Sequence, residues 1–256
     1  MKSTPTFTRR ATAQFAWLTL AATLLLPARL LAAPSVSNVP NTSTDDESAL
    51  NHFASVNVNN NGTNVQQVFF DFSPTNLGSF NLPVTNGGRY LFAVANAVAA
   101  ENLLQALVFT PVANVIPVGS FSNVIVRLHV VDSGGSSSGT NSSTLKITAL
   151  NNSPSFAFAG VGTKTINDND STNAFTGFTI NDVDNSATQP VTVTVLLDNS
   201  AKGSFTNLGS FTDLTNSFVF TGTAAAATTA IRALTFVPVP NRAAVGTNET
   251  TVLKVV

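Results

Sequence analysis

The sequence predicts an all-β fold made of sandwiches of short antiparallel strands, and three observations lead to this prediction. Only 10% of the residues are charged and 43% are hydrophobic, while Asn, Thr, Ser, Val and Phe are common, which is typical of strands and turns. Runs of alternating apolar residues, such as 123–132, 190–198 and 217–222, end at clusters of Gly, Asn, Asp and Pro. The chain also contains an internal duplication, which indicates two copies of one fold.

The first 32 residues have the features of a secretory signal peptide. A basic start, "MKSTPTFTRR", precedes an apolar run at 15–26 and then small residues, with cleavage predicted after Ala32. The apolar run is too short to span a membrane, and no later segment of spanning length follows it. The sequence therefore predicts export through the Sec pathway to the cell surface or the extracellular space, with no transmembrane segment in the mature chain.

The charge of the mature chain indicates that nucleic acid is not a partner. Four of the 12 basic residues lie in the signal peptide, so its removal leaves 8 basic and 13 acidic residues and a net charge of −5. Such a balance does not favour binding to phosphates. The chain has no cysteine, so an exported protein with this sequence must depend on its core or on bound ions for stability.

The duplication divides the mature chain into two repeats. Residues 106–129 match residues 233–256 at a constant offset of 127 positions. The identical residues of the first copy include Ala106, Leu107, Phe109, Pro111, Asn114, Val118 and Gly119. Because the flanking segments match at similar offsets, we assign one repeat to 33–150 and the other to 151–256.

Each repeat contains one exception to the strand pattern, and the second repeat is incomplete. The Ala-rich stretches 95–107 and 223–234 allow one or two helical turns. Val256 corresponds to His129, so the second repeat lacks its final strand, the equivalent of 130–150, and has an open edge. We expect the chain to be the N-terminal piece of a longer protein with more repeats, or a truncated form of one; the alternative is a partner strand supplied from elsewhere.

Several segments resemble a known family. The chain is similar to the cadherin-like tandem repeats of large bacterial surface and adhesin-type proteins. The similar segments are "NNSPSFAFAGVGTKTINDND" (151–170), "FTINDVDN" (178–185), "FTGTAAAATTAIRALTFVPVPN" (220–241) and "VVDSGG" (130–135). The resemblance implies Ig-like sandwiches joined in arrays, with calcium at the junctions between repeats.

The acidic residues of the second repeat fall into two groups that cannot share one ion. If its strands alternate in direction, Asp168 and Asp170 lie in the turn at one end of the repeat. Asp182 and Asp184 then lie in the loop at the other end, about one strand length or ~20 Å away. The alternative for both groups is that Asp and Asn occupy these loops because their side chains cap turns.

A calcium site is therefore predicted at the junction of the two repeats. Its residues are Asp45, Asp46 and Glu47 of the first repeat, Asn152 of the linker, and Asp182 and Asp184 of the second repeat. Asp168 and Asp170 would form the lower half-site for a following repeat. Because Thr148 replaces an acidic residue of the family pattern, we expect a low calcium affinity, ~10⁻⁴ to 10⁻³ M.

The sequence predicts a protein that is not an enzyme. Its two histidines, His52 and His129, are both expected on strands, and without cysteine they cannot form a plausible zinc site. No nucleophile elbow, phosphate loop or pair of catalytic glutamates is present. The phenylalanines expected at alternating strand positions in the core are Phe69, Phe175, Phe205, Phe220 and Phe236.

The predicted function is that of an exported surface or adhesion segment, a spacer or adhesive array of tandem sandwiches. Its partners would be the following repeats of the same chain and a protein or surface ligand that the sequence does not identify. The alternative is a carbohydrate- or matrix-binding sandwich belonging to a larger exported enzyme. The near absence of Trp and Tyr, which form the platforms of most sugar sites, weakens the carbohydrate interpretation.

Overall fold

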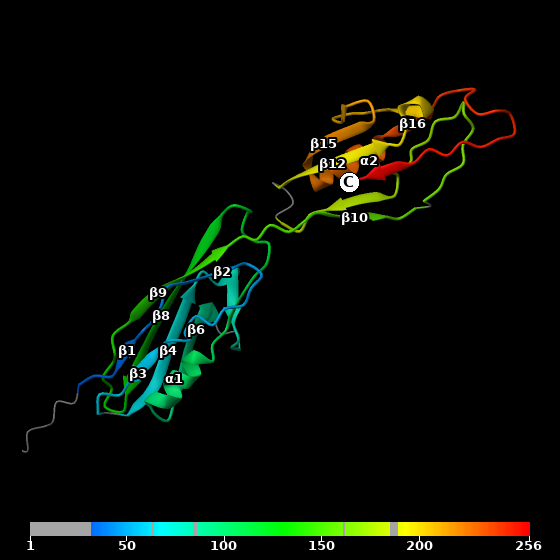
Figure 1. Cartoon of the computed structure of the whole chain (residues 1–256). Helices are drawn as coiled ribbons and strands as arrows, with labels where there is room; N and C mark the ends of the chain where they lie inside the picture. The colour runs from blue at the N-terminus through cyan, green and yellow to red at the C-terminus, as the bar shows by residue number, and fades with distance from the viewer. Residues whose placement is uncertain (1–31, 63, 84–85, 161, 185–188) are drawn as a thin grey trace, which may run out of the picture. The chain divides into compact units, whose positions relative to one another are not determined.

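The computed structural model describes residues 32–62, 64–83, 86–160, 162–184 and 189–256 (Figure 1). The predicted signal peptide lies outside these residues except for Ala32. The predicted all-β class is confirmed, because strands dominate and the described residues contain only two α-helices, α1 (Ala97–Gln105) and α2 (Ala224–Ala233). No helix within the described ranges is long and apolar enough to cross a membrane.

The described residues of the N-terminal part, 33–150, form three sheets. They pair as β2-β9-β8-β4-β6, β1-β3 and β5-β7, and β2 is parallel to β9 while the other pairs are antiparallel. The strands are β1 (Ser35–Ser37), β2 (Thr42–Asp45), β3 (Asn57–Asn59), β4 (Val65–Ser73), β5 (Gly78–Phe80), β6 (Arg89–Ala93), β7 (Phe109–Pro111), β8 (Phe121–Asp132) and β9 (Asn141–Thr148). Short 3-10 helices, η1 (Thr75–Leu77) and η2 (Asn86–Gly88), precede β5 and β6.

In the C-terminal part, 151–256, the residues that the structure describes also form three sheets. They pair as β14-β15-β12-β17, β10-β11 and β13-β16, all antiparallel. The strands are β10 (Ser155–Phe158), β11 (Phe178–Asn181), β12 (Pro190–Leu197), β13 (Gly203–Thr206), β14 (Thr212–Asp213), β15 (Ser217–Thr223), β16 (Thr235–Pro238) and β17 (Leu253–Val255). The 3-10 helix η3 (Ser200–Lys202) precedes β13.

Strand pairings follow the same order along the chain in the two parts. The pairs β1-β3, β5-β7 and β4-β6 of the N-terminal part correspond to β10-β11, β13-β16 and β12-β15 of the C-terminal part. The pair β4-β8 corresponds to β12-β17. The two parts differ at the edge of the large sheet, because β8 lies between β4 and β9, whereas β17 pairs with β12 alone among the described residues.

Each part has its own hydrophobic core, in which Val is the commonest buried residue in the N-terminal part and Phe in the C-terminal part. In the N-terminal part, alternate residues of β8, namely Val124, Val126, Leu128 and Val130, point inward and are buried, as expected for a sheet with one covered face. In the C-terminal part the core gathers around β12, β15 and α2. Among the described residues, no buried side chain belongs to both cores.

The two helices lie where the Ala-rich stretches predict them, although at 9 and 10 residues they are longer than one or two turns. Asn96 caps α1 by accepting a hydrogen bond from the backbone N of Ala99, and Thr223 caps α2 in the same way. Each helix buries residues spaced three or four apart, which in α1 are Ala97, Ala100 and Leu104.

Three sequence-based placements differ from the structure. Phe69 is half-buried and stacks on His129, because a bulge between Val65 and Gln67 shifts the inward positions of β4 to Val68 and Phe70. Phe175 does belong to the core, but it lies in a turn. His52 also lies in a turn, between β2 and β3, and not on a strand.

Candidate functional site

The acidic turn after β2 is organised by the buried carboxylate of Asp46. Its Oδ1 accepts a hydrogen bond from the backbone N of Leu150 (2.8 Å), and its Oδ2 accepts one from the backbone N of Asn114 (3.1 Å). The backbone N of Asp46 donates to the carbonyl of Thr148 (3.0 Å). Asp46 therefore joins its turn to the end of β9 and to the start of the linker.

The neighbouring Asp45 and Glu47 are engaged differently. Asp45 accepts hydrogen bonds from the Ser48 hydroxyl (2.9 Å) and the backbone N of Glu47 (3.0 Å). The bond from Ser48 lowers the pKa of Asp45, because it stabilises the carboxylate. Glu47 is exposed, and its Oε1 accepts a hydrogen bond from the side-chain amide of Asn152 in the linker (2.6 Å).

Asp182 and Asp184 lie in the loop between β11 and β12, as predicted, and both are buried. Asp182 Oδ1 accepts a hydrogen bond from the backbone N of Asp184 (3.0 Å), which closes a turn within the loop. Asp184 Oδ2 accepts a hydrogen bond from the backbone N of Asn152. The linker residue Asn152 is therefore hydrogen-bonded to both predicted halves of the junction site.

The described residues contain no group of three or more His, Cys, Asp and Glu side chains that could hold a metal ion. Both oxygens of Asp45 and of Asp46 already accept hydrogen bonds from the protein. Glu47, Asp182 and Asp184 each accept a bond on one oxygen only from the described residues. Calcium at the junction stays a prediction.

Of the predicted lower half-site, Asp170 makes a contact within its own turn and Asp168 one to a distant loop. Asp168 Oδ2 accepts a hydrogen bond from the backbone N of Asn241 (2.7 Å), and Asp170 Oδ2 accepts one from the Asn167 side chain (2.8 Å). The Asp168 contact repeats that of Asp46, because Asn241 corresponds to Asn114. Their role as a half-site for another repeat stays a prediction.

A buried Ser–His–Thr link was not anticipated from the sequence. His52 is fully buried, with Nε2 at 2.8 Å from the Ser143 hydroxyl and Nδ1 at 2.6 Å from the Thr42 hydroxyl. Burial lowers the pKa of His52 to about 4, so the ring is neutral at pH 7. The link connects β2 and β9 to the turn between β2 and β3. Because Ser143 lies 91 residues from His52 in the sequence, the residues around His52 could not predict this contact.

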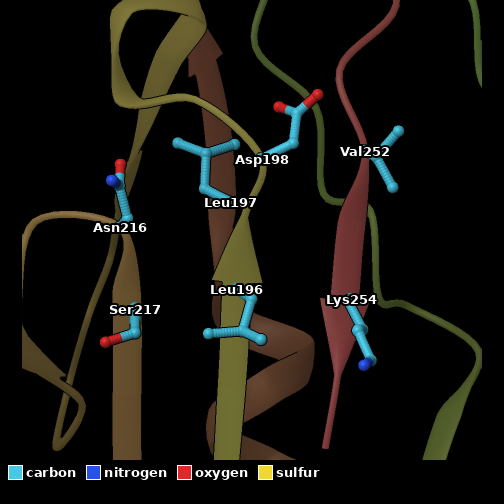
Figure 2. Close-up of a pocket in the computed structure, with 7 residues that line it drawn as sticks. All are labelled: Leu196, Leu197, Asp198, Asn216, Ser217, Val252 and Lys254. Carbon is cyan, nitrogen blue, oxygen red and sulfur yellow. The ribbon is translucent and has the colours of Figure 1, made fainter.

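A hollow lies over β12, β15 and β17 (Figure 2). Its lining residues are Leu196, Leu197, Asp198, Asn216, Ser217, Val252 and Lys254. Asp198 forms an ion pair with Lys202 (2.6 Å), and the hydrogen bond from Lys202 lowers the pKa of Asp198.

Comparisons with models of protein families and with curated proteins find no match to this chain. The resemblance to cadherin-like repeats therefore stays a prediction from the motifs of the sequence.

Replacing Asp46 by alanine should lower the free energy of unfolding of the N-terminal part by about 2 kcal/mol, because two backbone N–H groups lose their acceptor. Asp168→Ala is the matched control. It removes the equivalent bond to Asn241 from a half-buried position, so we expect less than half the effect on the C-terminal part. Urea unfolding of both variants measures the two losses, and equal losses would contradict the special role of Asp46.

Proposed function

We propose that this chain is an exported, non-enzymatic segment of a surface or adhesion protein. Its N-terminal and C-terminal parts would be tandem Ig-like, cadherin-like sandwiches that serve as spacers for display or adhesion. Residues 1–32 would direct export and be removed.

The proposal of two equivalent sandwiches is supported by the strand pairings and by a repeated close contact. Gly78 begins β5 against the ring of Phe109, and Gly203 begins β13 against the ring of Phe236. These pairs occupy corresponding positions in the internal duplication. Two unrelated folds would not be expected to place a glycine against a phenylalanine ring at corresponding positions.

The main support for the spacer role is that the short linker is hydrogen-bonded to residues of both the N-terminal and the C-terminal part. Leu150 is bound by Asp46, and the Asn152 side chain is bound by Glu47, both from the N-terminal part. The backbone N of Asn152 donates to Asp184 of the C-terminal part. A linker whose residues are engaged in this way resists bending more than a solvated one does, and a spacer needs that resistance.

Calcium is part of the proposal as a reinforcement of the linker. Glu47, Asp182 and Asp184 would supply carboxylate oxygens and Asn152 an amide oxygen, and backbone carbonyls and water would complete the six to eight ligands of the ion. The positive charge would offset the repulsion among these carboxylates. Binding in the range of about 10⁻⁴ to 10⁻³ M suits an extracellular setting, where calcium is abundant.

Small-angle scattering in EDTA and in a calcium titration tests this function. We expect the distance distribution of the chain to narrow as calcium reaches several times a dissociation constant of about 10⁻³ M. The double variant Asp182→Asn, Asp184→Asn should lose this response, while the matched double variant Asp168→Asn, Asp170→Asn keeps it. A calcium-independent curve removes calcium from the proposal, and a curve typical of freely jointed bodies in both conditions contradicts the spacer role.

A further inference from the structure

Strands β2 and β9 form the one parallel pair among the strands that the structure describes, and they lie side by side in the N-terminal part (Figure 1). Thr42 is opposite Leu145 and Asp45 is opposite Thr148. Strand β2 lies near the start of this part, whereas β9 ends just before the linker. The pair therefore joins the two ends of the N-terminal part directly.

Because the two strands are parallel, a pull between residue 33 and residue 150 loads their pair in shear. Such a pull draws β2 toward the end at which both strands begin, and it draws β9 toward the end at which both strands finish. The hydrogen bonds of a parallel pair are evenly spaced along the strands, so shear loads them together and not one after another. Separation in this direction must break several bonds at once.

Side chains and turn residues extend the contact beyond the two ends of β2. Before β2, Asn41 Oδ1 accepts a hydrogen bond from the backbone N of Thr144 in β9 (2.8 Å). After β2, the backbone N of Asp46 donates to the carbonyl of Thr148 (3.0 Å), and Asp46 Oδ1 accepts a bond from the backbone N of Leu150 (2.8 Å). The contact therefore covers 41–46 and includes the residue at which the linker begins.

The buried His52 adds a link between the same two strands. Its Nδ1 lies 2.6 Å from the Thr42 hydroxyl of β2, and its Nε2 lies 2.8 Å from the Ser143 hydroxyl of β9. His52 and Ser143 are both buried, and hydrogen bonds in such surroundings are stronger than in water. Strand β1, which precedes β2, pairs with β3 over three residues. The contact between β2 and β9 is therefore the more extensive of the two that hold the start of the chain.

We propose that the N-terminal part bears tension, and that the β2–β9 pair, with Asn41, Asp46 and His52, is the clamp that resists it. A ligand held at the N-terminal end of this part and an anchor beyond the linker would pull in the shear direction. Forced unfolding depends on the rate of unfolding, so a contact that must break first raises the unfolding force. The inference rests on the proposed function, which supplies the source of tension, but the resistance of the clamp is measured independently of linker stiffness and of calcium.

Single-molecule force spectroscopy in EDTA tests the proposal by pulling residues 33–256 in two directions. The chain has no cysteine, so a pair of introduced cysteines defines the points of attachment. Ala33→Cys with Ser153→Cys loads the clamp in shear. Ala33→Cys with Thr140→Cys instead pulls the starts of β2 and β9 apart, which breaks the bonds in turn, and all three positions are exposed. We expect an unfolding force several times higher in shear, and equal forces in the two directions overturn the proposal.

Two proline variants, both pulled in shear, locate the resistance. The backbone N of Asp46 donates to β9, and the direction of the N–H groups alternates along a strand, so the N–H of Thr44 also faces β9 while that of Ser43 faces away. Thr44→Pro should therefore lower the unfolding force, and Ser43→Pro, the matched control, should leave it nearly unchanged. Equal effects of the two prolines contradict the assignment of the clamp to β2 and β9. The comparison of the two pulling directions needs neither proline, so it decides the matter should Thr44→Pro not fold.

Discussion

Replacing Gly78 by alanine should lower the free energy of unfolding of the N-terminal part by about 3 kcal/mol or more. An added Cβ would lie 2.3 Å from Cζ of the Phe109 ring and 2.6 Å from the carbonyl oxygen of Thr110. The ring cannot move aside, because Phe109 is fully buried and contacts the rings of Phe72 and Phe80. The carbonyl belongs to the strand that pairs with β5, so any relief must break that pairing.

Two further glycines provide the comparison. At Gly203 an added Cβ would lie 2.5 Å from the ring of Phe236 and 2.6 Å from the carbonyl oxygen of Val237, so Gly203→Ala should destabilise the C-terminal part. Gly162→Ala is the control, because no atom lies within 4 Å of its added Cβ. Calorimetry should show the transition of the affected part shifted by about 12 °C or more for Gly78→Ala. A shift no larger than that of Gly162→Ala would mean that Gly78 does not pack as described.

Much of the fold could be predicted from the sequence because the strands are short and end at clusters of Gly, Asn, Asp and Pro. The strands β8, β12 and β15 were found from alternating apolar residues, and the helices α1 and α2 from Ala-rich runs. The error at Phe69 has a local cause. The bulge next to Val65 changes which residues face the core, and no residue type in this stretch marks the bulge.

For the predicted site, the positions of the loops could be predicted but the hydrogen-bond partners could not. The loops of Asp182 and Asp184, and of Asp168 and Asp170, were placed correctly, because Asp and Asn cluster at turns. Their hydrogen-bond partners depend on contacts between distant segments. Asp46 binds the backbone of Leu150, 104 residues away, so the sequence could not separate its structural role from that of a calcium ligand.

Acidification from pH 7 to pH 4.5 should lower the free energy of unfolding of the N-terminal part by about 2.5 kcal/mol through His52 alone. Burial lowers the pKa of His52 from 6.5 to about 4 in the folded chain. Between these values the unfolded chain binds a proton that the folded chain does not, so stability falls as the pH falls. Two carboxylates, Asp45 and Asp198, also have a lowered pKa. Their protonation lowers the free energy of unfolding only below about pH 4, because their ordinary pKa is 3.8.

Thermal unfolding across this pH range measures the effect, and the variants identify its source. In His52→Gln the free energy of unfolding should change little between pH 6.5 and pH 4.5. The amide can still bind the hydroxyls of Thr42 and Ser143 but does not titrate. His129→Asn is the matched control, because it replaces the half-exposed histidine that stacks on Phe69 and leaves the link of His52 intact. Should His52→Gln not fold, an NMR titration of the wild-type imidazoles decides the matter directly. A His52 signal that titrates near pH 6.5 in the folded chain would show that the buried link does not resist protonation.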